Sequence, residues 1–295
     1  MTTTHYLAWI SRWFALASSA VIFAGAQGCG GDAPLPPAHS SSFFPVRGTT
    51  DNGAAAGTLH WVYRINGGQA LPSNADPSMT IRFGDEQIDA RDGSTITTSL
   101  GADLTATGAS GHESVNETDH LTPGSSPATA DEKAVDIRIV VTGSGMQENL
   151  AEMLKFSYGS TPLSTFFDRD DLDSLAIGFA DTQTVQAVVT GSATATVTGA
   201  GTQTQSISMT LMSSTNWTLV DQLATFQVLG HDYANVVKVQ TVTQAIDPST
   251  GVLQEGDASI WLAKGIGVIR QEQTGSTFAT TGPVTSELVS TNLAP

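Results

Sequence analysis

Residues 184–197 have the sequence TVQAVVTGSATATV, in which alternate positions differ in polarity. One set of alternate positions is apolar: Val185, Ala187, Val189, Ala193, Ala195 and Val197. The positions between them are Thr, Gln or Ser, apart from Val188. Because successive side chains of a strand point to opposite faces, this pattern predicts a β-strand with one buried and one solvated face.

The same alternation recurs along the chain, in 59–65 (LHWVYRI), 135–141 (VDIRIVV) and 206–212 (SISMTLM). The turn sequence IDPSTG at 246–251 separates two further runs. Helical patterns are few: we expect three turns within 146–156 (MQENLAEMLKF) and one turn within 169–177 (RDDLDSLAI). We therefore predict a mainly β protein, with a curved antiparallel sheet that is half-barrel or sandwich-like and only a few short helices.

The segment 101–134 shows neither the alternation of a strand nor the repeat of a helix, and it is rich in Gly, Ser, Thr and Asp. It is too long for an ordinary connection in a compact domain. We expect a long surface loop or a domain boundary there.

The first 28 residues contain one basic residue, Arg12, and no acidic residue. Their apolar run, from Trp13 to Ala26, is shorter than the roughly 20 residues that a membrane-spanning helix needs. Small residues and glycines follow it, as in a secretory signal. We predict a lipoprotein signal peptide at 1–28, a flexible Gly-, Pro- and Ser-rich tether at 29–42, and a β-rich domain at 43–295.

Cys29 is the only cysteine of the chain and directly follows Ala26, Gln27 and Gly28. This stretch resembles the lipobox of bacterial lipoproteins, although Leu is more usual at 26, and Ala or Ser at 27. The resemblance implies cleavage before Cys29 and acylation of its thiol and amine. Stable attachment to a membrane takes two or more acyl chains, which such a cysteine carries. Gly30, rather than Asp, follows the cysteine, and by the same resemblance this implies the outer membrane; the leaflet is left open.

Acidic residues outnumber basic ones by 28 to 12, and the net charge is −16. No run of basic residues occurs anywhere in the chain. Nucleic acids and anionic lipids attract Lys and Arg clusters, so we expect no nucleic-acid partner.

No motif indicates a catalytic residue, a cofactor or a metal. The G-x-S-x-G sequence of many hydrolases is absent. Four aspartates lie close together, but no Gly or Glu completes a calcium loop, so we expect a charged turn and leave calcium open; they are Asp168, Asp170, Asp171 and Asp173. Paired carboxylates that meet only in space also stay open, as in glycan hydrolysis.

Two distant stretches resemble a family of bacterial envelope lipoproteins. The opening matches at Phe44, Pro45, Trp61 and Tyr63, and the later match comprises Asn235, Val236, Val237, Lys238, Val239, Trp261, Ala263, Gly265, Gly267 and Val268. The family is remotely similar to the lipoprotein-localisation (Lol-type) carriers, which implies a curved antiparallel sheet. From the residues themselves, Gly265 and Gly267 indicate a sharp bend, and Trp261 a large apolar anchor.

Our first hypothesis is a non-enzymatic, membrane-anchored lipoprotein that binds an apolar ligand or an envelope protein. The alternatives are an envelope hydrolase acting on glycans or esters, and a structural or adhesive surface lipoprotein. For the first hypothesis we expect an apolar concave face, which would hold a lipid-like guest or simply pack as core; its lining would be Met209, Leu211, Trp217, Val237, Val239 and Trp261.

Overall fold

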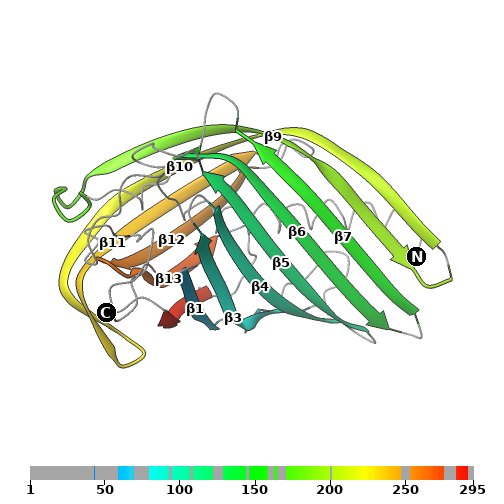
Figure 1. Cartoon of the computed structure of the whole chain (residues 1–295), viewed down its shortest axis with the longest axis horizontal. Helices are drawn as coiled ribbons and strands as arrows, with labels where there is room; N and C mark the ends of the chain where they lie inside the picture. The colour runs from blue at the N-terminus through cyan, green and yellow to red at the C-terminus, as the bar shows by residue number, and fades with distance from the viewer. Residues whose placement is uncertain are drawn as a thin grey trace.

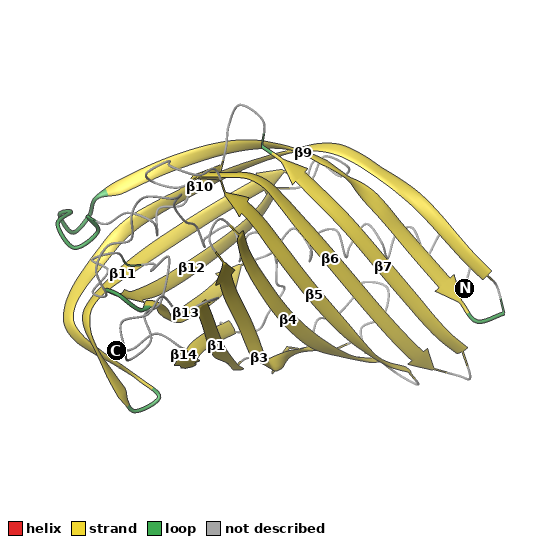
Figure 2. Cartoon of the chain, in the orientation of Figure 1, coloured by secondary structure: helices red, strands yellow, loops and turns green. Residues whose placement is uncertain are grey.

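The computed structural model describes Phe43 and twelve further stretches of the chain. These are residues 59–66, 68–69, 80–92, 95–106, 109–121, 129–143, 146–158, 163–164, 171–199, 201–246, 253–275 and 284–291. The described residues form strands and the turns between them (Figure 2). No helix that could span a membrane occurs among these residues.

The strands belong to a single antiparallel sheet of fourteen strands, of which β2 and β8 are only two residues long. Their bounds are β1 Leu59–Asn66, β2 Gly68–Gln69, β3 Thr80–Asp92, β4 Thr95–Ala106, β5 Ala109–Leu121, β6 Thr129–Gly143, β7 Met146–Ser157, β8 Leu163–Ser164, β9 Ala180–Val197, β10 Gly201–Val228, β11 His231–Ile246, β12 Leu253–Ala263, β13 Gly267–Gly275 and β14 Val284–Thr291. The sheet is strongly curved (Figure 1). The predicted fold class, a mainly β protein with a curved antiparallel sheet, is confirmed.

Most strands pair with their neighbours in sequence, and the strand order is β1-β14-β13-β12-β11-β10-β9-β7-β6-β5-β4-β3-β2. β1 has a partner on each side. It pairs with β14 over Trp61–Asn66 and with β3 over Leu59–Arg64. The first and last described strands are therefore hydrogen-bonded to one another.

The alternation expected from the sequence is observed. Trp61, Tyr63 and Ile65 are buried on β1, whereas His60 and Arg64 are exposed. On β6, β9 and the first half of β10, the residues on the apolar side of the pattern are buried or half-buried: Val135, Ile137, Ile139, Val141, Val185, Ala187, Val189, Ala193, Ala195, Val197, Ile207, Met209 and Leu211. We call this side of β5, β6, β7, β9 and the first half of β10 the buried face of the sheet, and the opposite side the exposed face.

Two expectations about single segments are wrong. The stretch 101–134 contains the end of β4, all of β5 and the start of β6, so it is not a long loop. The stretch 146–156 lies in β7 instead of forming a helix. In both segments acidic residues occupy the buried face, and this hides the apolar and polar alternation of a strand.

The two motifs of the lipoprotein resemblance lie in contact. Trp61 Nε1 donates a hydrogen bond to the carbonyl oxygen of Ile266 at 2.7 Å, and the Tyr63 hydroxyl donates to that of Val268 at 3.1 Å. Gly265 and Gly267 have φ angles of 81° and 107°, as the expected sharp bend requires. The motifs thus join the first strand to the turn between β12 and β13.

Candidate functional site

The most unusual feature of the buried face is a group of ionisable side chains, which we call the Lys133 cluster: Glu117, Asp119, Lys133 and Tyr158. Lys133 is fully shielded from solvent, and Glu117 and Asp119 are each 3% exposed. The Lys133 Nζ lies 3.2 Å from Glu117 Oε2 and 3.4 Å from Asp119 Oδ1. Asp119 and Lys133 are direct partners in the β5–β6 ladder, which fixes this arrangement.

The charges of the cluster follow from its burial. Burial acts to lower the pKa of Lys133, but the carboxylates of Asp119 and Glu117 outweigh it, and the pKa is raised. Burial raises the pKa of Asp119 despite the nearby ammonium group, and burial also raises the pKa of the Tyr158 phenol. Lys133 therefore stays charged at neutral pH and Tyr158 stays neutral.

Glu152 on β7 is a second buried acid, and it lies among apolar residues. It is 1% exposed, and neither of its carboxyl oxygens has a hydrogen-bond partner. Its partners in the ladders are Ile137 on β6 and Ala193 on β9. Burial raises the pKa of Glu152 to about 7, so near neutral pH a large fraction of this carboxyl group is uncharged and able to donate as well as accept a hydrogen bond.

The strand register relates Glu152 to the cluster. Lys133 is opposite Phe156, four residues along β7 from Glu152, which corresponds to about 13 Å at roughly 3.3 Å per residue. Leu154 lies between them on the same face and is buried. The buried face therefore presents two polar positions separated by apolar side chains.

The residues predicted to line an apolar face belong to the core or pack against it. Met209 and Leu211 are half-buried, and their ladder partners are Val189 and Ala187 on β9. Register places Met209 in one row across the sheet with the cluster, in the order Asp119, Lys133, Phe156, Val189 and Met209.

The other predicted lining residues lie further along the sheet. Trp217 is buried, and its ring centroid lies 5.5 Å from that of Phe179. Val237 and Val239 are buried on β11. Trp261 is buried, and it belongs to a segment of consecutive buried residues in β12. That these residues hold a guest stays a prediction.

Aromatic and charged contacts surround Trp261. The ring of Phe226 stacks on it with centroids 5.6 Å apart. The Lys238 ammonium lies 4.6 Å from the centre of the Trp261 ring, and the Arg270 guanidinium 5.5 Å. Trp261 is therefore fixed by cation–π and stacking contacts, which agrees with its expected role as an anchor.

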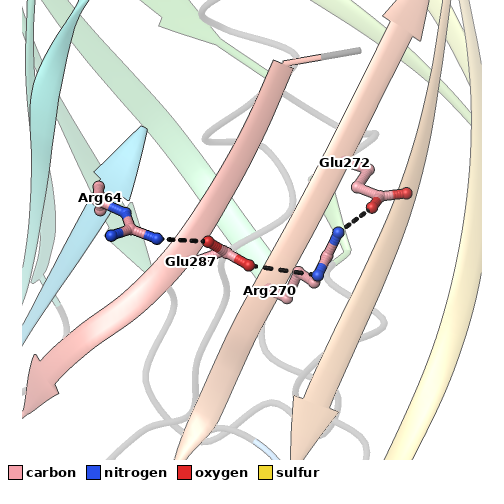
Figure 3. Close-up of polar contacts among 4 residues, drawn as sticks. All are labelled: Arg64, Arg270, Glu272 and Glu287. Carbon is pink, nitrogen blue, oxygen red and sulfur yellow. Dashed lines mark hydrogen bonds and ion pairs between the residues drawn. The ribbon is translucent and has the colours of Figure 1, made fainter. Parts of the chain in front are cut away.

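Arg270 also belongs to a chain of ion pairs that joins three strands (Figure 3). Glu287 on β14 contacts Arg64 on β1 at 3.1 Å and Arg270 on β13 at 3.2 Å, and Arg270 contacts Glu272. These residues face one another because Arg64 and Arg270 are both ladder partners of Glu287. The network holds the first strand against the last two and has no free acid or base for chemistry.

The aspartates considered for calcium serve the structure where they are described. The Asp171 carbonyl accepts hydrogen bonds from the amide and the hydroxyl of Ser174, which closes a tight turn. Asp173 forms an ion pair with Lys264. Asp168, Asp170 and Cys29 lie outside the described residues. Within the described part of the chain, no group of three or more His, Cys, Asp and Glu side chains could hold a metal ion.

Sequence analysis missed the Lys133 cluster and Glu152. Glu117 and Asp119 occupy the same set of alternate positions on β5 as the buried Val115, and Glu152 occupies the same set on β7 as the buried Leu150 and Leu154. Once β5 and β7 are assigned as strands, this spacing places the acids on the buried face. The signal in the sequence was therefore an acidic residue two positions away from an apolar one.

Comparisons with known proteins show only weak similarity in structure. A candidate lipoprotein from Parabacteroides distasonis matches with a TM-score of 0.32 and 10% identity, over 85% of this chain and 98% of its own. A candidate exported protein with a YmcC-like fold, from Bacteroides fragilis, matches with a TM-score of 0.31 and 10% identity, over 83% of this chain and 99% of its own. At such scores neither the fold nor the function of these proteins is transferred to this chain. No family model and no curated protein matches the sequence.

Proposed function

We propose that this chain is a lipid-anchored protein of the bacterial outer membrane that binds an amphipathic, lipid-like ligand without converting it. The lipobox-like sequence before Cys29 supports the anchor, and Gly30 supports the outer membrane. The observation that carries ligand binding is Glu152, a shielded carboxyl group whose hydrogen-bonding atoms have no partner.

An unpaired buried polar group is costly, by about 1–3 kcal/mol, and a ligand that satisfies it recovers part of that free energy. The neighbours of Glu152 are apolar, so they favour a ligand with an apolar body and one or two polar atoms. Leu154 continues the apolar surface along β7 beside Glu152. A fatty acid has this combination of features.

Non-enzymatic binding fits the chemistry of the cluster. Lys133 is held by two carboxylates and stays protonated, which removes it as a nucleophile or base. Tyr158 is likewise held in its neutral form by burial.

The test is binding of a dansyl-labelled fatty acid, measured by fluorescence, to full-length protein carrying Cys29→Ser. We expect saturable binding by the parent. Binding should weaken by about tenfold in Glu152→Leu, which cannot form the hydrogen bond, since one such bond is worth about 1.4 kcal/mol.

The matched control is Glu132→Leu, which removes a half-exposed carboxylate that pairs with Lys155 on the surface. This variant should bind the probe as the parent does. Absence of probe binding by the folded parent, or equal binding by both leucine variants, would contradict the proposed site.

A further inference from the structure

Among the described strands, the first half of β10 has a partner on one side only, and we call its other side the free edge. β10 pairs with β9 from Gly201 to Thr218, but its ladder with β11 begins only at Met212. No described strand pairs with residues 201–211 on the side away from β9. Figure 1 shows the paired β9 and β10 extending to the right of the view, past the ends of β11 and β12.

This edge lacks the charged side chains, prolines and bulges by which proteins keep strand edges from pairing with other chains. Residues 201–211 contain no Lys, no Pro and no charge, and their register with β9 is continuous, without a bulge. Residues 201–206 are all exposed. A long, regular and uncharged edge with unpaired backbone groups favours the addition of another strand.

The charge distribution favours a second copy of this chain as the partner. The protein has a net charge of −16, so two copies repel one another over most of their surfaces. From Thr182 to Val220, however, no residue is charged, and the free edge lies within this stretch. Two copies can approach there without bringing like charges together.

The edge is also complementary to itself. Full antiparallel overlap of residues 201–211 with the same residues of a second copy places Ser206 opposite Ser206, and Thr204 opposite Ser208. These are hydroxyl pairs on the exposed face, and the hairpin already contains such pairs: the hydroxyls of Thr194 and Thr204 lie 3.1 Å apart.

We propose that residues 201–211 of β10 pair with the same residues of a second copy, giving a twofold-symmetric dimer in which the two sheets are continuous. The interface is isologous, as a closed twofold dimer requires. It uses only backbone groups and side chains of the free edge, and it is independent of ligand binding.

The first test is the mass in solution of the full-length chain in detergent, by analytical ultracentrifugation with correction for bound detergent. We expect twice the mass that mass spectrometry gives for one chain of the same preparation. Thr204→Lys with Ser208→Lys should give single chains, because like charges directly opposite one another destabilise strand pairing.

The matched control is Ala151→Lys with Met153→Lys, which makes the same change of charge on the exposed face of β7. β7 pairs with β6 and with β9, so it has no free edge where these residues lie. The control should remain dimeric. A monomeric parent, or equal loss of the dimer in both lysine variants, would overturn the proposal.

The second test uses the single cysteine of the chain. In a Cys29→Ser background, Ser206→Cys provides the only thiol, and mild oxidation should link two copies, because facing Cβ atoms at a strand pair come close to disulfide distance. Ala151→Cys should not form this link. A dimer that Ser206→Cys fails to link, or capture of a different protein in place of a second copy, would reject the proposed pairing.

Discussion

Lys133 and Glu152 are both shielded from solvent, but the fold treats their charges in opposite ways. Lys133 keeps its charge because two carboxylates lie within 3.4 Å of its Nζ. No cation among the described residues offsets the burial of Glu152, and burial favours its protonated form instead. The buried face thus holds a charged Lys133 that is paired with carboxylates, and a Glu152 carboxyl group that becomes neutral by binding a proton.

Removing the cation of the cluster should be more damaging than removing all of its charges. Lys133→Met leaves Glu117 and Asp119 buried without their partner, and we expect the free energy of unfolding to fall by about 3–5 kcal/mol. Urea unfolding at pH 7 measures this change. The triple variant with Glu117→Gln and Asp119→Asn should lose less, and equal losses would show that the three groups are not coupled.

Glu152 should make the protein less stable as the pH rises. Its pKa is about 7 in the folded state against 4.5 in the unfolded chain, so the folded state binds the proton more tightly. Its contribution to stability is fully present below pH 4.5 and is lost as the pH rises through 7, by up to about 3 kcal/mol. Urea midpoints at pH 5 and pH 8 should differ less in Glu152→Gln than in the parent; an unchanged difference would assign the pH dependence to other groups.

At the scale of single strands, the sequence predicts those stretches whose buried side chains are all apolar. β1, residues 135–141 of β6, β9 and the first half of β10 show the expected alternation of buried and exposed side chains. β5 and β7 escape prediction because Asp119 and Glu152 occupy buried positions, and nothing in the sequence shows that Lys133 would lie opposite Asp119. The pairing of β1 with β14 is likewise a long-range contact, which alternation alone does not specify.

Gly191 should be essential where β9 passes β7. A Cβ atom at this position would lie 2.1 Å from the carbonyl oxygen of Met153, a backbone atom that cannot move aside easily. We expect Gly191→Ala to lower stability by about 1–3 kcal/mol, as other overpacked sites do. Thermal unfolding followed by circular dichroism measures the effect, with Ser192→Ala on the same strand as the control; equal melting temperatures would refute the close approach.

At the scale of the whole molecule, the proposed lipid anchor at Cys29 would determine where the protein is found in the cell. Cys29→Ser removes the thiol that acylation needs, so we expect the protein to leave the membrane fraction or to retain its signal peptide. Fractionation with an antibody against the β-rich domain distinguishes the two forms from the parent. Recovery of the variant in outer membranes at the mature size would contradict lipidation at Cys29.

The hydrogen bonds from Trp61 and Tyr63 to the carbonyls of Ile266 and Val268 have a consequence for biogenesis. In a chain that is exported from its N-terminus, β1 emerges early and β14 emerges last. The backbone groups on the β14 side of β1 therefore stay unpaired until more than two hundred further residues have emerged. Contacts between residues so far apart in the sequence make folding slow and leave an aggregation-prone intermediate. For a chain exported as we propose, the native state would therefore form only after β14 has emerged, and the incomplete sheet would need protection from aggregation until then.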